Sequence, residues 1–403
     1  MNKSYAVLFQ PIDDKTNCIG IYADGNLIFD ESKMPKNLSK TWRYTGSLTS
    51  EDIEYAWIYA NGKAMGDVCP EELLETWEKT SRKIRAYKKS FDIAKINLRE
   101  HCFFELIPHD ALAQFCEAKN KITEYVFENF EKPKNYDYLA AAAKLLYKIK
   151  YQDLKIDNSD CRSLFINSGM RNSSQKVLNG PKYINYNLFG TVTGRLSTHP
   201  QSFPILTMKR ELRRLIKPQN GWFISLDYNG AEVRTLLALS EQKQPIGDIH
   251  DWNITNVFKN SGMQREEAKT TFFAWMYNPD SDYIDTNHYN REKVLDRYYD
   301  GEYINTIFGR HIKVSNWKAF NYLIQSTTAD LVIDRATVID RMLEGRKSFI
   351  SHIVHDEIVI DFADEDRDLL SEIKDVFAKN KLAVFKVNLK AGKNYYDLEN
   401  LLL

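Results

Sequence analysis

Two cations and two aromatic rings recur at four-residue steps in the segment REEAKTTFFAWMYN, where they are Arg265, Lys269, Phe273 and Tyr277. Four residues turn a helix by about 400°, so the four side chains share a face about 120° wide. Cations of this kind bind phosphate groups, and aromatic rings stack on flat bases. An ordinary amphipathic helix with basic residues on its solvent face would show the same spacing. Other parts of the chain must therefore decide between the two interpretations.

Two acidic residues far apart in the sequence follow predicted strands. The β-prone run 222–226 ends at Asp227, and the run 349–354 leads to Asp356 in a junction with a returning strand. An acid at the end of a buried strand is costly to ionise without a cationic partner. Either acid alone could be an ordinary turn aspartate. Two strand-borne carboxylates together need a divalent metal ion, and hard oxygen ligands select Mg²⁺ or Mn²⁺.

With these motifs, the chain resembles the polymerase module of the family A (DNA polymerase I-like) DNA polymerases. The matches to the three main motifs are LDYNGAEVR for motif A, R-x3-K-x3-F-x3-Y for motif B and VHDE for motif C. Further matches are TVTGRLSTHPQSFPIL (191–206), DIH (248–250), IFGR (307–310) and FNYLIQSTTADL (320–331). They cover about residues 180 to 400 in the order of the family, whereas the first 70 residues resemble no family.

The resemblance implies a site for two Mg²⁺ ions, with Mn²⁺ able to substitute. Asp227 and Asp356 would hold the ions about 4 Å apart. The backbone carbonyl of Tyr228 would be a further ligand, and Glu357 would support the site without being a principal ligand. The residues with an implied catalytic role are Asp227, Asp356, Glu357 and Lys269.

The resemblance also implies a site for a deoxynucleoside triphosphate (dNTP). Its triphosphate would be bound by Arg265, Lys269 and His250. Phe273 would stack on the incoming base and sugar, and Tyr277 would occupy or guard the template position. Glu232 would cap the sugar pocket, where a ribose 2′-hydroxyl would collide with the carboxylate.

Contacts to DNA are implied for Arg195, Asn321 and Gln325, near the primer terminus, and expected for Arg213, Arg214 and His355. The chain departs from the family at Asn229-Gly230 in motif A, and at Ala274 and Asn278 in and after motif B. None of these departures removes a metal ligand or a cation that binds the triphosphate.

Composition is that of an ordinary globular protein, with 43% hydrophobic and 27% charged residues. The 403 residues predict two or three subdomains. Five cysteines, odd in number and scattered along the sequence, argue against a disulfide framework or zinc site: Cys18, Cys69, Cys102, Cys116 and Cys161. Because the sequence has no apolar run of about 20 residues and no secretory signal, we expect no membrane association and a cytoplasmic location.

The formal net charge is zero, but basic residues are locally concentrated. Between Lys79 and Arg99, eight cations accompany one acid, Asp92. A second basic cluster consists of Lys209, Arg210, Arg213, Arg214 and Lys217. Runs of this kind are usually solvated faces, but two of them favour contacts with a nucleic-acid backbone.

The alternation of predicted strands and helices predicts an α+β fold. The resemblance implies a right-hand polymerase with palm, fingers and thumb. The predicted parts are a small β-rich region (1–70), a helical thumb (71–180), the first part of the palm (181–247), the fingers (248–306) and the second part of the palm (307–403). Within the β-rich region, one predicted strand is Ala56–Tyr59.

The expected function is template-directed, primer-dependent DNA synthesis from dNTPs by a two-metal mechanism. A D-x-E motif at residues 52–54 follows Ser50, a residue type that favours the N-cap of a helix, rather than a buried strand. We therefore expect no 3′–5′ proofreading. We also expect no five-prime nuclease domain of the kind found in bacterial relatives, as in a phage-like minimal form. Expected partners are primer–template DNA and dNTPs, with accessory replication proteins possible and a monomeric state.

Two alternatives remain open. One is a single-subunit RNA polymerase-like enzyme, although such enzymes lack the acid at Glu232 and have HDS rather than the HDE that ends in Glu357. The other is an inactive, polymerase-derived DNA-binding protein, which the intact metal-binding and triphosphate-binding residues disfavour.

Overall fold

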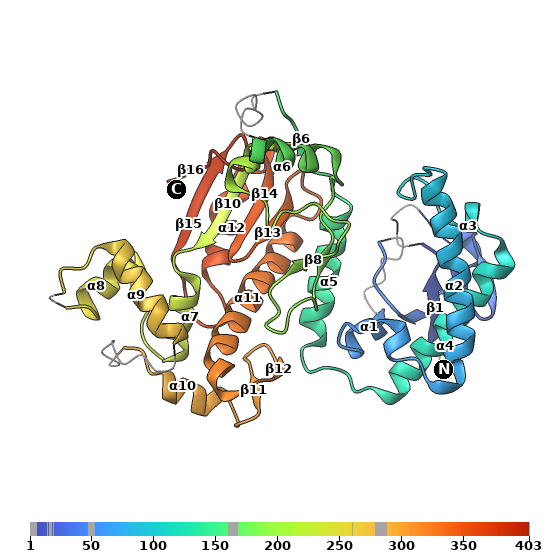
Figure 1. The fold of residues 1–403 in the computed structure, drawn as a ribbon, viewed down its shortest axis with the longest axis horizontal. Coiled ribbons are helices and arrows are strands. Elements are labelled where there is room, and N and C mark those ends of the chain that lie inside the picture. The colour runs from blue at the N-terminus through green and yellow to red at the C-terminus, as the bar shows by residue number, and fades with distance from the viewer. Residues whose placement is uncertain are drawn as a thin grey trace. The chain divides into compact units, whose positions relative to one another are not determined.

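The computed structural model describes residues 6–13, 15, 18, 20–46, 53–159, 168–259, 261–278 and 288–402. The chain divides into two compact units, Met1–Tyr147 (unit 1) and Lys148–Leu403 (unit 2). In Figure 1, unit 1 runs from blue to teal and unit 2 from teal to red. None of the helices in the described ranges has both the length and the hydropathy of a membrane-spanning segment.

Unit 1 contains a mixed five-stranded sheet with the order β3-β2-β1-β4-β5. The central strand β1 pairs with β2 in antiparallel and with β4 in parallel orientation. The strand bounds are β1 (Val7–Pro11), β2 (Ile21–Ala23), β3 (Asn26–Ile28), β4 (Leu38–Thr41) and β5 (Glu54–Tyr55). The helices are α1 (Ala56–Tyr59), α2 (Glu71–Ile93), α3 (Phe103–Leu106), α4 (His109–Asn129) and α5 (Tyr136–Lys150), whose last three residues belong to unit 2, with short 3-10 helices η1 (Glu31–Lys33) and η2 (Met65–Asp67).

The prediction of a strand at Ala56–Tyr59 is wrong, because this segment is the helix α1. The backbone N–H of Ala60 donates to the carbonyl of Ala56 at 2.9 Å, which closes a helical turn. A turn through Asn61 and Gly62, both with positive φ, follows immediately.

Helix α4 packs on this sheet and α2 packs on α4, so the two helices do not form a separate arm. Ile84 of α2 and Leu112 of α4 share a buried cluster with Ile12 and Tyr22. The boundary expected at residue 70 therefore falls inside unit 1, and the segment 71–180 expected as a thumb is divided between the two units.

Cys18 and Cys102 lie close together, although 84 residues separate them in the sequence. Their sulfur atoms and a carboxylate oxygen of Asp13 all lie within 4.8 Å of one another, which the scattered positions along the chain did not predict. Lys15 donates to the Asp13 carboxylate and, at 3.0 Å, to the carbonyl of Leu98, so this acid already has a counterion. Cys18, Cys69, Cys102 and Cys116 are free, and Cys161 lies outside the described residues.

Unit 2 is built on an antiparallel sheet with the order β13-β14-β10-β15-β16. Its strands are β10 (Gly221–Tyr228), β13 (Phe349–Val354), β14 (Glu357–Ala363), β15 (Val387–Gly392) and β16 (Glu399–Asn400). The helices are α6 (Ser168–Asn179), α7 (Ala231–Leu239), α8 (Ile249–Asn256), α9 (Arg265–Tyr277), α10 (Arg291–Tyr298), α11 (Asn316–Met342) and α12 (Leu370–Ala378).

Shorter elements complete unit 2. They are the two-stranded pairs β6 (Lys155–Ile156) with β9 (Ile216–Lys217), β7 (Tyr186–Asn187) with β8 (Ser197–Thr198) and β11 (Tyr303–Asn305) with β12 (His311–Lys313), and the 3-10 helices η4 (Arg210–Leu215) and η5 (Asp364–Leu369).

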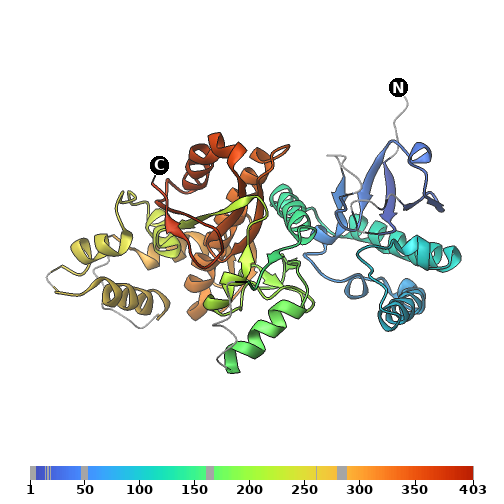
Figure 2. The ribbon, with the colours of Figure 1, turned by 90° about the horizontal axis from the view of Figure 1, so that it is seen from above.

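Side chains alternate between the two faces of β10, as strand geometry requires. Tyr228 lies on the face covered by α12, where its ring stacks on Phe377 with centroids 4.2 Å apart. Asp227 points to the other face, beyond Ser225. Figure 1 shows α11 running alongside the sheet, and Figure 2 shows the yellow helices α8 and α9 grouped together beside it.

A second buried cluster fixes the position of α9. Phe272 and Trp275 of α9 pack with Leu236 of α7, Tyr289 and Leu323 of α11. Since the buried residues occupy one side of α9, its opposite side is left for the predicted functional residues. The mixture of segregated sheet and helices confirms the predicted α+β class.

Candidate active site

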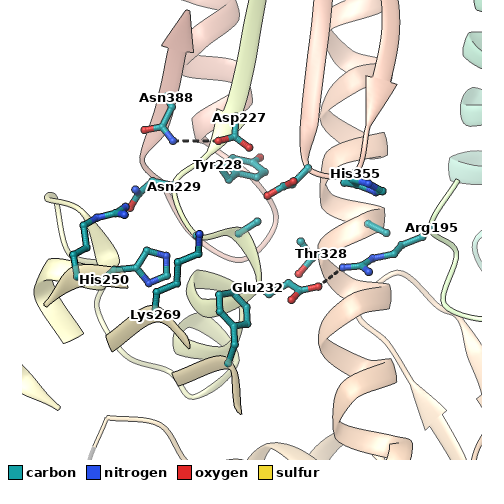
Figure 3. A pocket seen from close by; sticks show the side chains of 16 residues that line it. Arg195, Asp227, Tyr228, Asn229, Glu232, His250, Lys269, Thr328, His355 and Asn388 are labelled. Atoms are coloured by element: carbon teal, nitrogen blue, oxygen red, sulfur yellow. Dashed lines mark hydrogen bonds and ion pairs between the residues drawn. The ribbon is translucent and has the colours of Figure 1, made fainter. Parts of the chain in front are cut away.

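A pocket of about 450 Å³ in unit 2 collects most of the residues predicted from the sequence. It opens where the end of β10, the start of α7, the helices α8, α9 and α11, the β13–β14 turn and β15 meet (Figure 3). The residues that line it are Arg195, Asp227, Tyr228, Asn229, Gly230, Ala231, Glu232, His250, Arg265, Lys269, Phe273, Thr328, Ala329, His355, Asp356 and Asn388.

Strand register brings the two predicted metal-binding acids together. Asp227 is paired with Glu357 across β10 and β14, and the two-residue turn His355-Asp356 joins β13 to β14. His355 has a φ of +57°, in the left-handed region, which allows the tight turn. Asp356 therefore lies next to Asp227 in space, and both line the pocket.

The electrostatics of the two acids favour a bound cation. Burial, with the charge of Asp356 as the next cause, raises the pKa of Asp227 to about 7. Burial also raises the pKa of Asp356, and the charge of Glu232 adds to this effect. Two buried carboxylates that repel each other are stabilised either by a proton or by a cation between them. The donor set of carboxylate and backbone oxygens therefore fits a hard divalent ion.

Tyr228 can offer only its backbone to this part of the pocket. Its hydroxyl donates to the carbonyl of Phe377 at 2.6 Å, on the opposite face of the sheet. Asn388 on β15, which the sequence reading missed, donates to Asp227 Oδ2 at 3.2 Å (Figure 3). Its only sequence signal is that it is a polar residue between Val387 and Leu389, in a segment for which no strand was predicted.

Glu357 is held beside the acid pair but does not line the pocket. Ser225 Oγ donates to its Oε1 at 2.5 Å, and the hydroxyl of Tyr395 donates to its Oε2 at 2.7 Å. Since both oxygens of Glu357 already accept hydrogen bonds from protein groups, this geometry agrees with a supporting role rather than that of a principal ligand.

The four-residue pattern on α9 forms one face, as predicted. Arg265, Lys269 and Phe273 line the pocket, and the ring of Tyr277 stacks on that of Phe273 with centroids 6.0 Å apart. Figure 3 shows the amino group of Lys269 pointing from α9 toward the strand end that carries Asp227. The α9 face thus presents a cation and an aromatic ring opposite the acids.

Arg265 is paired with an acid inside the protein. Its Nη2 donates to Asp248 Oδ2 at 2.9 Å. Asp248 is also the N-cap of α8, because its Oδ1 accepts from the backbone N–H of His250 at 2.9 Å. Burial alone would raise the pKa of Asp248. The hydrogen bonds from Arg265 and Asn229 outweigh burial and hold this pKa well below its usual range.

His250 lies on the pocket wall with its side chain almost fully buried. Burial lowers the pKa of this imidazole, so the neutral form is favoured. Its Nδ1 has no hydrogen-bond partner among the described residues, which leaves one polar atom available to a ligand.

Glu232, which the resemblance places at the sugar pocket, has its carboxylate held by two hydrogen bonds. Arg195 and Tyr277 both donate to its carboxylate, one to each oxygen. Burial, followed by the charge of Glu232, raises the pKa of Tyr277, and Gln325 also hydrogen-bonds this phenol. The carboxylate is therefore fixed in one orientation (Figure 3).

Arg234 is a structural residue that the site prediction omitted. Its guanidinium is fully buried and donates to the carbonyls of Asn229 (2.7 Å), Pro245 (2.9 Å) and Gly247 (2.7 Å). Asn229 in turn donates to Asp248 Oδ2 at 2.7 Å. This network ties the end of β10 to the segment before α8. Its only sequence signal was its position, since Arg234 is the final residue of the motif A segment LDYNGAEVR.

Gly230 occupies the junction between β10 and α7. Its φ of +64° is left-handed, and an added Cβ would lie 2.4 Å from Ile249 Cγ2. We expect Gly230→Ala to lower the free energy of unfolding by about 2–4 kcal/mol, because strain and overpacking combine. Urea denaturation followed by circular dichroism measures this. The control is Gly247→Ala, where a Cβ would meet open space; equal stability of the two variants would contradict the prediction.

Four predicted DNA-binding residues lie outside the pocket lining. Asn321 and Gln325 lie on α11, and the guanidinium groups of Arg213 and Arg214 stack over the rings of Tyr395 and Tyr396, at 4.6 and 4.5 Å. The roles of these four residues stay predictions. Two lining residues that the sequence reading missed, Thr328 and Ala329, belong to α11 and reach the pocket through tertiary packing alone.

A comparison with solved structures identifies the class of fold. The POL domain of Pol1 from M. smegmatis, in complex with DNA primer-template and dNTP, matches with a TM-score of 0.64. The match covers 97% of this chain and 96% of that chain at 13% sequence identity. The fold is therefore that of a polymerase domain.

Sequence relatives give the family resemblance. DNA polymerase I of Chloroflexus aurantiacus is 26% identical over 282 residues, which are 55% of this chain and 30% of the relative. DNA polymerase I of Caldicellulosiruptor bescii is 25% identical over 265 residues (52% and 31%), and the thermostable DNA polymerase I of Thermus aquaticus is 24% identical over 233 residues (45% and 28%).

The resemblance to the DNA polymerase I family is thereby confirmed. The chain spans less than a third of the length of each of these curated relatives. No family model matches the chain.

Proposed function

We propose that this protein synthesises DNA from dNTPs, directed by a template and starting from a primer. The observation that carries the proposal is the meeting of Asp227 and Asp356 in one pocket, opposite Arg265 and Lys269 of α9. The resemblance to DNA polymerase I and the fold of a solved polymerase domain that holds primer-template and dNTP support it.

The acids would hold two divalent cations, Mg²⁺ or Mn²⁺. Asp227, Asp356 and the backbone carbonyl of Tyr228 are the proposed ligands. When bound, the cations would lower the pKa of the primer 3′-hydroxyl and neutralise charge on the triphosphate and leaving pyrophosphate. Asn388 would orient the Asp227 carboxylate through its hydrogen bond, and Ser225 and Tyr395 would hold Glu357 in its supporting position.

The residues of α8 and α9 would bind and align the triphosphate. Lys269 and Arg265 would bind its oxygens, and Arg265 would exchange its internal partner Asp248 for the phosphate. His250 would donate a hydrogen bond from its imidazole N–H to a triphosphate oxygen. In-line displacement at the α-phosphate joins the nucleotide to the primer and releases pyrophosphate, so alignment and charge neutralisation supply most of the rate.

A primer-extension assay tests the proposal. A labelled primer annealed to a longer template is incubated with Mg²⁺ and all four dNTPs, and the same reaction is repeated with ribonucleotides. We expect extension to the template end with dNTPs and far less with ribonucleotides. Equal use of the two substrates would support an RNA polymerase-like enzyme instead, and no extension with either would support an inactive DNA-binding protein.

The pKa of Asp227 predicts that cation affinity rises with pH. Below pH 7 the acid is protonated in the cation-free protein, and it must lose this proton to become a ligand. We expect the Kd for Mn²⁺ to tighten about tenfold between pH 6 and pH 8, as one proton is released per ion. Titration calorimetry at pH 6, 7 and 8 measures this. Asp227→Asn is the control, and a Kd for the unchanged protein that does not vary with pH would contradict the prediction.

We also propose that the D-x-E motif at residues 52–54 does not support 3′–5′ proofreading by this chain. Of the D-x-E motif, Asp52 lies outside the described residues. Glu54 is engaged in an ion pair with Lys132 at 2.6 Å and accepts a hydrogen bond from Tyr59 at 3.2 Å. Incubation of a primer with a labelled, mismatched 3′ end and Mg²⁺ tests this proposal, and removal of the mismatched nucleotide would contradict it.

A further inference from the structure

The helix α2 of unit 1 carries an exposed row of cations that do not line the pocket in unit 2. We call this set the α2 basic face. It consists of Lys79, Arg82, Lys83, Arg85 and Lys89, all of which are exposed. The buried side chains of α2 are Thr80, Ile84 and Phe91, which lie on the opposite side of the helix. The basic face therefore points away from the core of unit 1.

These five cations form no ion pair within the described part of the chain. Among the described residues, no carboxylate forms an ion pair with any of them, whereas other lysines of unit 1, such as Lys33, Lys121 and Lys132, do have acidic partners. The side chains are long and flexible, and none is fixed against a neighbouring acid. Within the described residues, the face is thus a concentration of positive charge, and the nearest acids of α2, Glu75 and Glu78, lie at its N-terminal end without forming an ion pair with it.

The helix dipole does not explain the position of these cations. Acids in the first turn of α2, Glu71 and Glu72, are favourable because they lie near its N-terminus. The dipole effect falls off within one turn of each end, and the cations lie in the middle of a 23-residue helix. Pairs such as Lys79 with Lys83 and Arg85 with Lys89 are four residues apart, where like charges repel. Their repulsion is relieved if a polyanion binds across the face.

We propose that the α2 basic face binds the phosphate backbone of the primer–template duplex, so that unit 1 contributes DNA affinity without taking part in the reaction. The identity of the polyanion rests on the proposed function. From Lys79 to Lys89 the helix advances about 15 Å. The same length of duplex carries about nine phosphates on its two strands. Lysine and arginine contacts to phosphate fix the position of DNA without reading its sequence.

Two variants, each of which replaces three cations by neutral glutamine, test the proposal. The test variant is Arg82→Gln/Arg85→Gln/Lys89→Gln, and the control is Lys33→Gln/Lys36→Gln/Lys63→Gln, which removes three exposed lysines elsewhere in unit 1. Glutamine is a good helix former, so α2 is retained. Affinity for a fluorescent primer–template is measured by anisotropy between 50 and 200 mM salt, and the rate of primer extension is measured at saturating DNA.

We expect the test variant to bind at least tenfold more weakly at 50 mM salt. The slope of log affinity against log salt should fall by about 2–3, since each phosphate contact contributes about 0.9. The control should match the unchanged protein, and the extension rate at saturating DNA should stay within twofold for both variants. Equal affinity and slope for the test and control variants would overturn the proposal.

Acetylation of the unchanged protein gives a second measurement that requires no substitution. Primer–template DNA should protect Lys79, Lys83 and Lys89 from acetylation, as read by mass spectrometry, and should leave Lys36 and Lys63 reactive. Reactivity of Lys79, Lys83 and Lys89 that is unchanged by DNA would overturn the proposal. Both measurements report DNA binding, so they remain informative if primer extension itself fails.

Discussion

Asp227→Asn should abolish primer extension, reducing its rate by about 1000-fold or more. The substitution keeps the shape of the side chain and its position opposite Glu357, but it removes the negative charge that the proposed cations need. Metal ions supply several kcal/mol of transition-state stabilisation in reactions of this kind, and each 1.36 kcal/mol corresponds to a tenfold change in rate. Affinity for primer–template DNA should remain close to that of the unchanged protein.

Single-turnover extension and fluorescence anisotropy measure the two quantities for Asp227→Asn. The matched control is Asp364→Asn, which removes one carboxylate from an exposed position just after β14 and should leave the rate unchanged. More than a few percent of activity in Asp227→Asn would refute the assignment of this acid as a metal ligand. A parallel loss of DNA affinity would point instead to a folding defect.

Glu232→Ala should reduce the preference for deoxyribonucleotides over ribonucleotides by about 10–100-fold. Because Arg195 and Tyr277 hold both carboxylate oxygens, Glu232 cannot turn aside for a 2′-hydroxyl. Forcing an extra atom into a fixed site costs about 1–3 kcal/mol, which sets the expected loss of discrimination when the side chain is removed.

The ratio of kcat/KM for a dNTP to that for the matching ribonucleotide measures this prediction. Glu232→Gln is the control, since it keeps the bulk of the side chain and should preserve most of the discrimination. If Glu232→Ala shows the same ratio as the unchanged protein, another group excludes ribonucleotides.

The parts of the site that were predictable from sequence are those whose geometry is local. Arg265, Lys269 and Phe273 share a face because a single helix carries them, so their spacing was sufficient. Asp227 and Asp356 were each recognisable as an acid after a strand. Their proximity followed from the family resemblance, and in the structure it depends on the pairing of β10 with β14.

The features that were missed depend on contacts between distant segments. Asn388 and Thr328 reach the pocket only because β15 pairs with β10 and α11 packs on α7. Arg234 ends the motif A segment, but the backbone carbonyls through which it organises the site cannot be identified from residue types. The packing of α4 on the sheet of unit 1 likewise depends on side chains that are far apart along the chain.

The β10–β14 ladder restricts which changes of length the chain can tolerate. Seven consecutive pairs, from Gly221 with Ala363 to Asp227 with Glu357, set the alignment of the two strands. Adding or deleting a single residue within β14 would turn the following side chains to the other face of the sheet. Apart from Asp356 itself, the hairpin therefore tolerates a change of residue type more readily than a change of residue number, unlike surface connections that do not border the pocket.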